Sequence, residues 1–135
     1  MHDEREGKVA INSEGDIVIA RKIVRDVAIA IGFGVTDVTR IVTAASELTR
    51  NVFRYAGSGI MSWRLLNVGE HIGIELTFED HGPGIPDVEQ ALEIGYTTSG
   101  GLGLGLPGAK RLMDEMAIQS EVGKGTRVTV KKWRR

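Results

Sequence analysis

The sequence predicts an α+β fold: a two-layer α/β sandwich in which helices cover one face of a mixed, mostly antiparallel sheet. Apolar residues recur every three or four positions over 17–31 and over 41–52, as on one face of a helix. Over 72–80 they alternate with polar residues, as in a strand that buries one face. Hairpins interspersed with helices pack as one sheet with the helices on one side. The 135 residues are the length of one domain, taken as 1–135.

Capping and turn residues divide the chain into its elements. Asp16 is an N-cap residue type directly before the first apolar stripe, and Gly32 and Gly34 follow the end of that stripe. The segment 67–71 is expected to be a hairpin loop. The expected elements are an edge strand over 8–11, a helix from 17 to 31, a helix from about 36 to 56, strands over 60–68 and 72–80, a short helix over 86–94, a helix from about 106 to 116, and strands over 117–122 and 127–133.

The charge balance shows no excess of basic residues that could bind a polyanion. The 17 basic and 18 acidic residues leave a formal net charge of -1, so a nucleic-acid partner is not expected. The basic run at the end of the chain, 131–135, is interpreted as a solvated terminus.

The absence of cysteine excludes disulfides, thiol catalysis and thiolate metal sites, and it fits a reducing compartment. The three histidines are scattered and do not suggest a transition-metal site. No apolar stretch reaches the about 18 residues of a membrane span, and the charged start does not resemble a signal peptide. We expect a cytoplasmic protein that makes no use of a membrane.

Glu47 and Asn51 lie four residues apart in the second predicted helix, so both side chains share one face. A carboxylate and an amide so placed can reach one ligand. An isolated pair of this kind more often caps or solvates an exposed helix face. Spacing alone leaves both interpretations open.

Asp80 follows the alternating strand on the same side as its apolar residues. A carboxylate at the end of a buried stripe needs a hydrogen-bond partner. It can bond backbone N–H groups of the following turn, as in an Asx turn. It can also accept from a ligand, and Gly82 and Gly84 favour this interpretation because they would let a planar ligand approach the backbone.

Glycines gather over 100–108, where five of the nine residues are glycine. They lead into a predicted helix with Pro107 in its first turn, so bare N–H groups and the helix dipole both point at a bound anion. A phosphate cradle is the preferred interpretation, and tight turning is the alternative. The segment also matches the dinucleotide fingerprint, but the polar residues 96–100 before it do not form the buried strand that this motif requires.

Four segments resemble, in order, the nucleotide-binding boxes of the GHKL (Bergerat) family, which includes gyrase, Hsp90, histidine kinase catalytic domains and anti-sigma-factor serine kinases. Segment 47–51 resembles the N box, 80–84 the D-x-G-x-G box, 101–106 the second glycine box and 123–126 the final one. One box alone is unspecific, whereas four in sequence are specific. Nearly the whole chain is similar to the serine/threonine switch kinases of the bacterial stressosome.

The resemblance implies the Bergerat fold, with ATP and Mg²⁺ as ligands. Glu47 would be the general base toward the attacking hydroxyl, and Asn51 would ligate Mg²⁺. Some kinases of the wider family carry a basic residue in the lid, the segment that covers the phosphates. This chain has no lysine or arginine from 81 to 109. The hypothesis is that the intrinsic kinase activity is low and depends on the scaffold formed by the protein's partners. Positive charge would come from Mg²⁺, backbone N–H groups, the partner, or Arg50, Arg54, Lys110 and Arg111.

The resemblance also assigns the nucleotide contacts. Asp80 would accept a hydrogen bond from the adenine amino group, Gly82 and Gly84 would lie beside the base, and Thr126 would complete that pocket. The remaining nucleotide contacts, chiefly to the phosphates, would fall to Thr98, Ser99, Gly101, Gly103, Gly105 and Leu106.

The implied function is an ATP-dependent serine/threonine protein kinase. It would phosphorylate STAS-domain scaffold proteins of the RsbS and RsbR types and then, once released, activate a downstream phosphatase or cyclase. The alternative is an ATP-gated binding module that sequesters a regulator, as anti-sigma factors do, with little or no kinase activity. Glu47 favours the kinase, because a pure binding module needs no general base.

Overall fold

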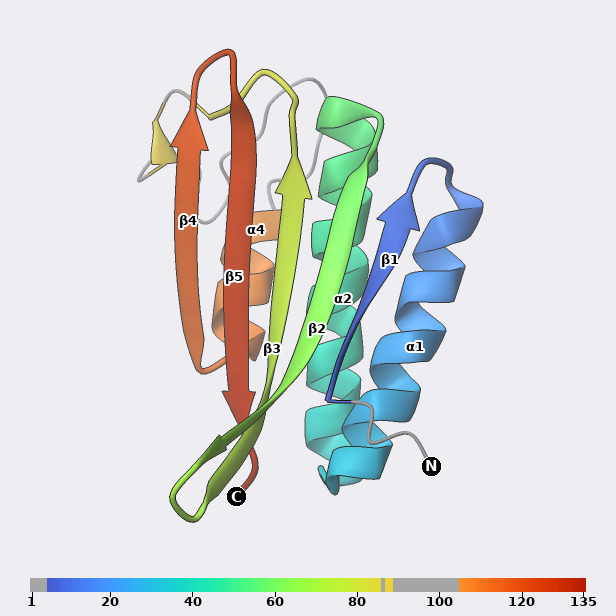
Figure 1. Cartoon of the computed structure of the whole chain (residues 1–135), viewed down its shortest axis with the longest axis vertical. Helices are drawn as coiled ribbons and strands as arrows, with labels where there is room; N and C mark the ends of the chain where they lie inside the picture. Colours follow the sequence, from blue (N-terminus) through green and yellow to red (C-terminus); the bar gives the residue numbers. More distant parts are fainter. Residues whose placement is uncertain (1–4, 86, 89–104) are drawn as a thin grey trace.

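The structure, a computed structural model, describes residues 5–85, 87–88 and 105–135. The predicted short helix over 86–94 therefore falls almost entirely outside the described residues. In chain order the elements are β1 (Glu6–Ile11), α1 (Gly15–Ile31), α2 (Val35–Ala56), β2 (Gly59–Val68), β3 (His71–Asp80), α4 (Gly105–Leu112), β4 (Glu115–Glu121) and β5 (Gly125–Trp133) (Figure 1).

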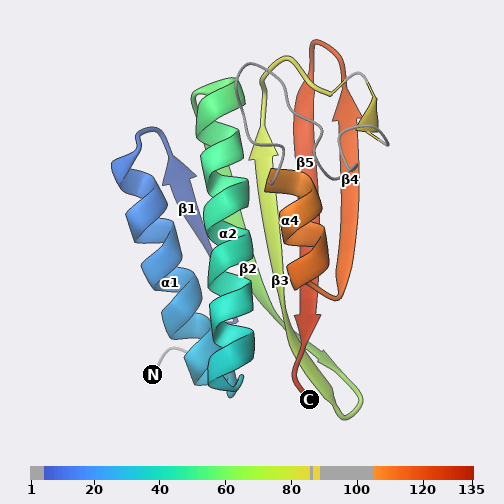
Figure 2. The same ribbon diagram turned by 180° about the vertical axis from the view of Figure 1, so that it is seen from behind.

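The described strands form one sheet in the order β1-β2-β3-β5-β4. The helices α1, α2 and α4 all lie on the same face of this sheet (Figure 1, Figure 2). The predicted two-layer α/β sandwich is thus confirmed, although each pairing among these strands is antiparallel, so this sheet is not mixed. The last strand, β5, lies between β3 and β4 and is therefore an interior strand of the sheet.

The core lies between α2 and the sheet. In Figure 2, α2 runs between α1 and α4, and it packs against both. Ile41 and Leu48 of α2 are buried, as are Leu76 and Phe78 of β3, which confirms the helical stripe and the alternation read from the sequence. Fully burying one such side chain stabilises the fold by about 1.5–3 kcal/mol. This interface therefore holds the two layers together.

Both long helices end at glycines, and Gly32 was predicted from the sequence. Gly32 has a φ of 103° and donates its N–H to the carbonyl of Ala28. Gly57 has a φ of 81° and donates to the carbonyl of Phe53. Left-handed backbone at this position suits glycine and closes the last helical turn.

The prediction that Asp16 is the N-cap of the first helix is wrong, because the N-cap position is Glu14, two residues earlier. Helix α1 begins at Gly15, and the Asp16 carboxylate instead accepts the N–H groups of Asn12, at 2.8 Å, and Ser13, at 3.1 Å. Asp16 therefore fastens the turn between β1 and α1.

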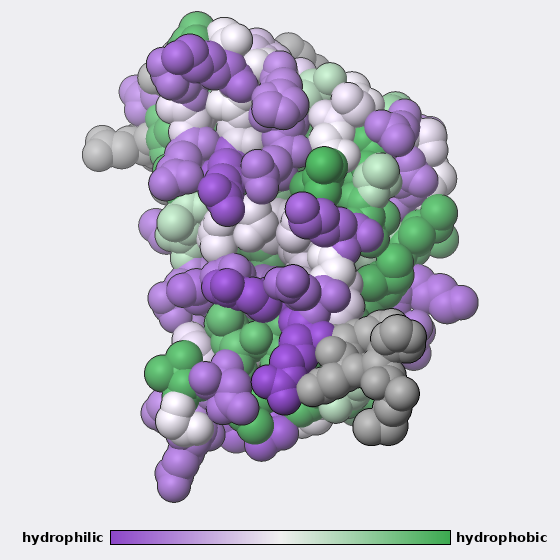
Figure 3. All heavy atoms as spheres, viewed as in Figure 1, coloured by the Kyte–Doolittle hydropathy of each residue, from purple (hydrophilic) through white to green (hydrophobic). Residues whose placement is uncertain are grey.

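The open face of the sheet is polar. Figure 3, which looks onto this face, shows hydrophilic residues across it. Glu75 lies 3.1 Å from Arg64 and 3.8 Å from Lys131 on the flanking strands, and Arg127 lies 3.8 Å from Glu79. These cross-strand pairs make the face suited to water.

The predicted helix from about 106 to 116 is too long. Helix α4 ends at Leu112, and β4 begins at Glu115. The reason is a long-range contact: the N–H of Asp114 donates to the carbonyl of Lys131 at 2.9 Å, which draws the chain out of the helix and into the sheet.

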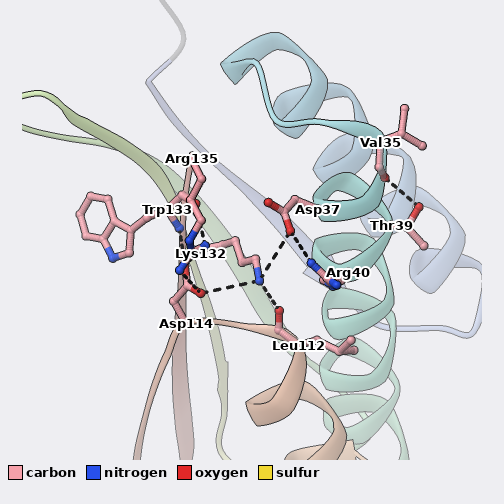
Figure 4. A network of polar contacts seen from close by, with 9 residues as sticks. All are labelled: Val35, Asp37, Thr39, Arg40, Leu112, Asp114, Lys132, Trp133 and Arg135. Atoms are coloured by element: carbon pink, nitrogen blue, oxygen red, sulfur yellow. Dashed lines mark hydrogen bonds and ion pairs between the residues drawn. The ribbon is translucent and has the colours of Figure 1, made fainter.

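The basic end of the chain is structural, so its interpretation as a solvated terminus is wrong. Lys132 is 6% exposed, and its ammonium group donates to the carbonyl of Leu112 at 2.8 Å, at the end of α4 (Figure 4). Arg134 donates to the carbonyl of Ile31 at 2.9 Å, at the end of α1. Two helices therefore end against cations from the last residues of the chain, where the helix dipole favours positive charge.

Asp114 holds this basic end in place. Its carboxylate accepts from both terminal nitrogens of Arg135, each at 3.1 Å, and from the N–H of Trp133 at 2.8 Å, and it lies 3.7 Å from the Lys132 ammonium group (Figure 4). Burial by itself raises the pKa of Asp114. The hydrogen bonds from Arg135 and Trp133 and the charges of Lys132 and Arg135 outweigh burial, so the pKa lies below its ordinary value.

We predict that Asp114→Asn destabilises the protein in a pH-dependent way. The pKa of Asp114 is depressed in the fold, so its contribution is complete above the unfolded value of about 3.9 and is lost as pH falls through the folded value. The variant should lose about 1.5–3 kcal/mol of unfolding free energy at pH 7, measured by urea denaturation.

The difference between wild type and Asp114→Asn should shrink below about pH 4. Asp26→Asn, which changes an exposed carboxylate on α1, is the control and should have little effect at either pH. An equal loss for Asp114→Asn at pH 7 and pH 3 would contradict the assignment.

Candidate functional site

Asp80 is the last residue of β3 and begins the site. Its Oδ1 accepts the N–H of Gly82 at 2.9 Å, which forms the Asx turn considered from the sequence. A carboxylate has a second oxygen with its own acceptor capacity. Both interpretations of Asp80 are therefore chemically compatible, with Oδ1 serving the turn and Oδ2 available to a ligand N–H.

Thr126 lies directly across from Asp80. The two residues are cross-strand partners between β3 and β5, so their side chains share one face. The structure thus brings together two of the residues singled out in the sequence. They lie 46 positions apart in the chain but are directly paired in the sheet. The predicted strand over 127–133 placed Thr126 in the preceding turn, whereas β5 begins at Gly125.

The loop after β3 is fastened to the β4–β5 hairpin. The carbonyl of Pro83 accepts the N–H of Gly123 at 2.9 Å, and the N–H of Ile85 donates to the Ser120 hydroxyl at 2.7 Å. The Ser120 hydroxyl also lies 2.9 Å from the Thr126 hydroxyl. Sequence reasoning missed Ser120. Its register opposite Thr126 is the signal that could have found it.

Close backbone approaches explain several glycines here. Gly125 has a φ of 116°, and a Cβ on it would overlap the carbonyl oxygen of Asp80. A Cβ on Gly84 would overlap the carbonyl oxygen of Glu121, and one on Gly82 would come within 2.7 Å of Ala56 at the end of α2. Gly82 and Gly84 thus have a packing role, and their contact with a ligand stays a prediction.

Glu47 and Asn51 lie on α2, both partly buried. An Oε1 of Glu47 pairs with Arg50 at 2.9 Å, with the two side chains 33% and 41% exposed. The same helix reaches the end of β3, because a Cβ on Gly59 would contact both Val52 of α2 and Asp80. The side chains of one helix therefore lead from the Glu47–Arg50 pair toward Asp80.

Helix α4 supplies the third side of the site. It begins at Gly105, and Leu106 packs against the core. It lies beside α2 (Figure 2), and Ala109 is fully buried. Thr98, Ser99, Gly101 and Gly103 lie outside the described residues.

The described residues contain no group of three or more histidine, aspartate or glutamate side chains arranged to hold a metal ion. A site of the Mg²⁺–nucleotide type does not require one, since Mg²⁺ binds through one or two protein oxygens together with substrate phosphates. The side-chain oxygen of Asn51 is a ligand of the kind such an ion accepts. Within the part of the chain that the structure describes, no helix is long and apolar enough to cross a membrane.

Comparison with known proteins places the chain in a family. Residues 36–135 match the family described as histidine kinase-, DNA gyrase B-, and HSP90-like ATPase. The chain is 49% identical over 127 residues to serine/threonine-protein kinase RsbT of Bacillus subtilis (strain 168). The aligned region covers 94% of this chain and 96% of that protein. It is 36% identical over 103 residues to the anti-sigma F factor of Geobacillus stearothermophilus, covering 71% of this chain and 69% of that protein.

Solved structures share the fold. A structure of the RsbU and RsbW domains of a Mycobacterium tuberculosis protein has a TM-score of 0.63 at 18% identity, covering 96% of this chain and 33% of that one. The mycobacterial sensor histidine kinase MprB has a TM-score of 0.60 at 22% identity, covering 96% of this chain and 98% of that one.

We predict that Gly125→Ala is more destabilising than Gly123→Ala. Both glycines have positive φ, but a Cβ on Gly123 would meet nothing within 4 Å, whereas one on Gly125 would overlap Asp80. Gly123→Ala should cost about 1–2 kcal/mol through backbone strain alone, and Gly125→Ala a further 1–3 kcal/mol through the overlap. Urea denaturation of the two variants measures the difference, and equal losses would contradict the close approach.

Proposed function

The chain belongs to the histidine kinase-, DNA gyrase B- and HSP90-like ATPase family as a serine/threonine-protein kinase of the RsbT type, and we propose that it phosphorylates STAS-domain scaffold proteins of the RsbS and RsbR types. The observation that carries the nucleotide part is the pairing of Asp80 with Thr126 beside the Asx turn. It joins a carboxylate acceptor and a hydroxyl on one face, next to tightly packed glycine backbone.

Adenine would bind at this end of the sheet. The free oxygen of Asp80 would accept from the amino group of the base, and Thr126 would contact the base from the adjacent strand. Gly82 and Gly84 would bring bare backbone close to the plane of the ring. Because the loop is tied to the β4–β5 hairpin through Pro83 and Ile85, this pocket would be formed before the nucleotide arrives.

The phosphates would lie toward the start of α4. The N–H groups of Gly101, Gly103 and Gly105, with Thr98, Ser99 and Leu106 near them, would hold the phosphate oxygens, helped by the positive end of the helix dipole. Asn51 would hold Mg²⁺. When bound together with ATP, Mg²⁺ neutralises the charge that develops on the phosphate oxygens.

Glu47 would act as the general base. The acceptor hydroxyl of the partner would give its proton to a Glu47 carboxylate oxygen as the hydroxyl oxygen bonds to the γ-phosphorus. The bond from that phosphorus to the bridging oxygen would break, and ADP would leave with that oxygen. The Glu47 carboxylate must be ionised to accept this proton.

Arg50 is also a candidate for the positive charge that the segment 81–109 lacks, because it lies beside Glu47. An ion pair as exposed as Arg50–Glu47 is worth at most about 1 kcal/mol, so Arg50 can leave Glu47 at little cost. Partner binding that shifts Arg50 toward the phosphates would then free the Glu47 carboxylate and also stabilise the phosphoryl group during its transfer. This gives a physical reason for low activity without the scaffold.

We further propose a cytoplasmic, partner-switching role, in which the kinase is released after phosphorylation and activates a downstream phosphatase or cyclase. The similarity to an anti-sigma F factor supports a second candidate function, an ATP-gated binding module with little or no kinase activity. The general base distinguishes the two, because a binding module has no step that uses Glu47.

Glu47→Gln should lower phosphate transfer by at least about 100-fold, because it removes the proton acceptor, while ADP binding stays within a few-fold of wild type. Transfer of labelled phosphate from Mg-ATP to a STAS-domain partner measures the rate. Asn51→Ala should lose both transfer and Mg²⁺-dependent nucleotide binding.

The control is Glu79→Gln, which changes an exposed carboxylate next to Asp80 and should transfer at the wild-type rate. A wild-type rate in Glu47→Gln would show that the base assignment is wrong. If no STAS-domain partner is labelled by the wild type while ATP changes its affinity for that partner, the binding-module function is correct.

Scaffold dependence is tested by comparing an isolated STAS-domain substrate with the assembled scaffold at equal acceptor concentration. We expect faster transfer to the assembled scaffold. Arg50→Gln should reduce that advantage, because it removes the cation that the scaffold is expected to redirect. Equal rates with isolated and assembled substrate would count against the hypothesis.

A further inference from the structure

Three residues form a row across the sheet at the base-binding end. Ser120 of β4 pairs with Thr126 of β5, and Thr126 pairs with Asp80 of β3. Directly paired residues present their side chains on the same face, and all three are partly buried. Asp80 and Thr126 belong to the proposed adenine site, whereas Ser120 has no role in it so far.

The Ser120 hydroxyl has three polar neighbours. It accepts the N–H of Ile85 at 2.7 Å, lies 3.2 Å from the carbonyl oxygen of Gly125, and lies 2.9 Å from the hydroxyl of Thr126. These neighbours come from three segments: the loop after β3, the hairpin turn and the start of β5.

One arrangement of the hydroxyl protons satisfies all three contacts of Ser120 at once. A serine hydroxyl donates one hydrogen bond and accepts two. The Ile85 N–H can only donate and the Gly125 carbonyl can only accept, so Ser120 accepts from Ile85 and donates to Gly125. In the arrangement that satisfies all three contacts, the remaining position of Ser120 is an acceptor and Thr126 is the donor between the two hydroxyls.

In this arrangement the proton of Thr126 points to Ser120. Toward a ligand the Thr126 oxygen can then only accept. The Asp80 carboxylate oxygen that does not serve the Asx turn can also only accept. The row therefore presents two acceptors to a nucleobase. A base with an amino group at this position can donate to them. A base with a carbonyl oxygen there is disfavoured, since two acceptors cannot share a hydrogen bond.

We propose that Ser120 is a specificity-determining residue of the nucleotide site, which orients the Thr126 hydroxyl and so selects adenine over guanine. The inference rests on the proposed function. Ser120 acts through Thr126 and is a positioning residue, since it need not touch the nucleotide.

The test compares Mg-ADP and Mg-GDP binding by calorimetry in wild type and Ser120→Ala. Without Ser120 the Thr126 proton is released and can donate to the guanine carbonyl oxygen. The ratio of the ADP to the GDP association constant should fall about 10-fold, the equivalent of one neutral hydrogen bond changed from repulsive to favourable. Gln119→Ala, an exposed neighbour on β4, is the control and should keep the wild-type ratio.

A second variant separates specificity from simple loosening of the loop. Thr126→Val removes the hydroxyl that Ser120 orients, so adding Ser120→Ala to Thr126→Val should change the ADP-to-GDP ratio no further. A ratio that falls again in the double variant, or a Ser120→Ala variant that binds both nucleotides more weakly by the same factor, would overturn the proposal.

The failure of the proposed function has a different signature. Wild-type protein that binds neither nucleotide would overturn the nucleotide site and this inference together. Wild-type protein that prefers ADP, with Ser120→Ala keeping the full preference, would overturn the role of Ser120 alone.

Discussion

The insertion of β5 between β3 and β4 is the constraint on which the rest of the structure depends. The start of β5 places Thr126 beside Asp80, where β3 ends. The other end of β5 brings Lys132 to the last carbonyl of α4, so the strand also fixes the helix whose beginning faces the proposed phosphate site. Since β5 is paired along both sides, neither end can shift without breaking ladder hydrogen bonds. One strand thus sets the distance between the base-binding end and α4.

The two ends of the proposed site rely on different physics. At the Asp80–Thr126 end, backbone segments are in van der Waals contact through glycines such as Gly125, and the hydroxyls of Ser120 and Thr126 lie 2.9 Å apart. Such a surface is preorganised and costs little reorganisation when a ligand binds. At the catalytic end, Glu47 is paired with Arg50 in a solvent-exposed ion pair, which is weak and easily exchanged. The proposed site would thus combine a preorganised nucleotide pocket with a weakly paired general base, Glu47, which suits a kinase controlled by its partners.

Much of the fold could be predicted from local patterns. The apolar stripe of α2, the alternation of β3 and the glycines that end α1 and α2 depend on neighbours within one or two turns, and the structure confirms each of them. Three of the errors share one cause, because they concern partners distant in the sequence. Ser120 meets Ile85 across 35 positions, Lys132 meets Leu112 across 20, and Arg134 meets Ile31 across 103. No local period reports such pairs, so the basic end looked solvated, α4 looked longer than it is, and Ser120 stayed unnoticed.

The central claim is that the Asp80–Thr126 end of the sheet recognises the adenine of ATP. A crystal structure of the protein with Mg-ADP tests it most directly. The account predicts that the amino group of the base lies within hydrogen-bond distance of the Asp80 oxygen that does not serve the Asx turn, with the Thr126 hydroxyl turned toward Ser120. Adenine bound away from Asp80, or an Asp80 carboxylate with no contact to the base, would contradict it.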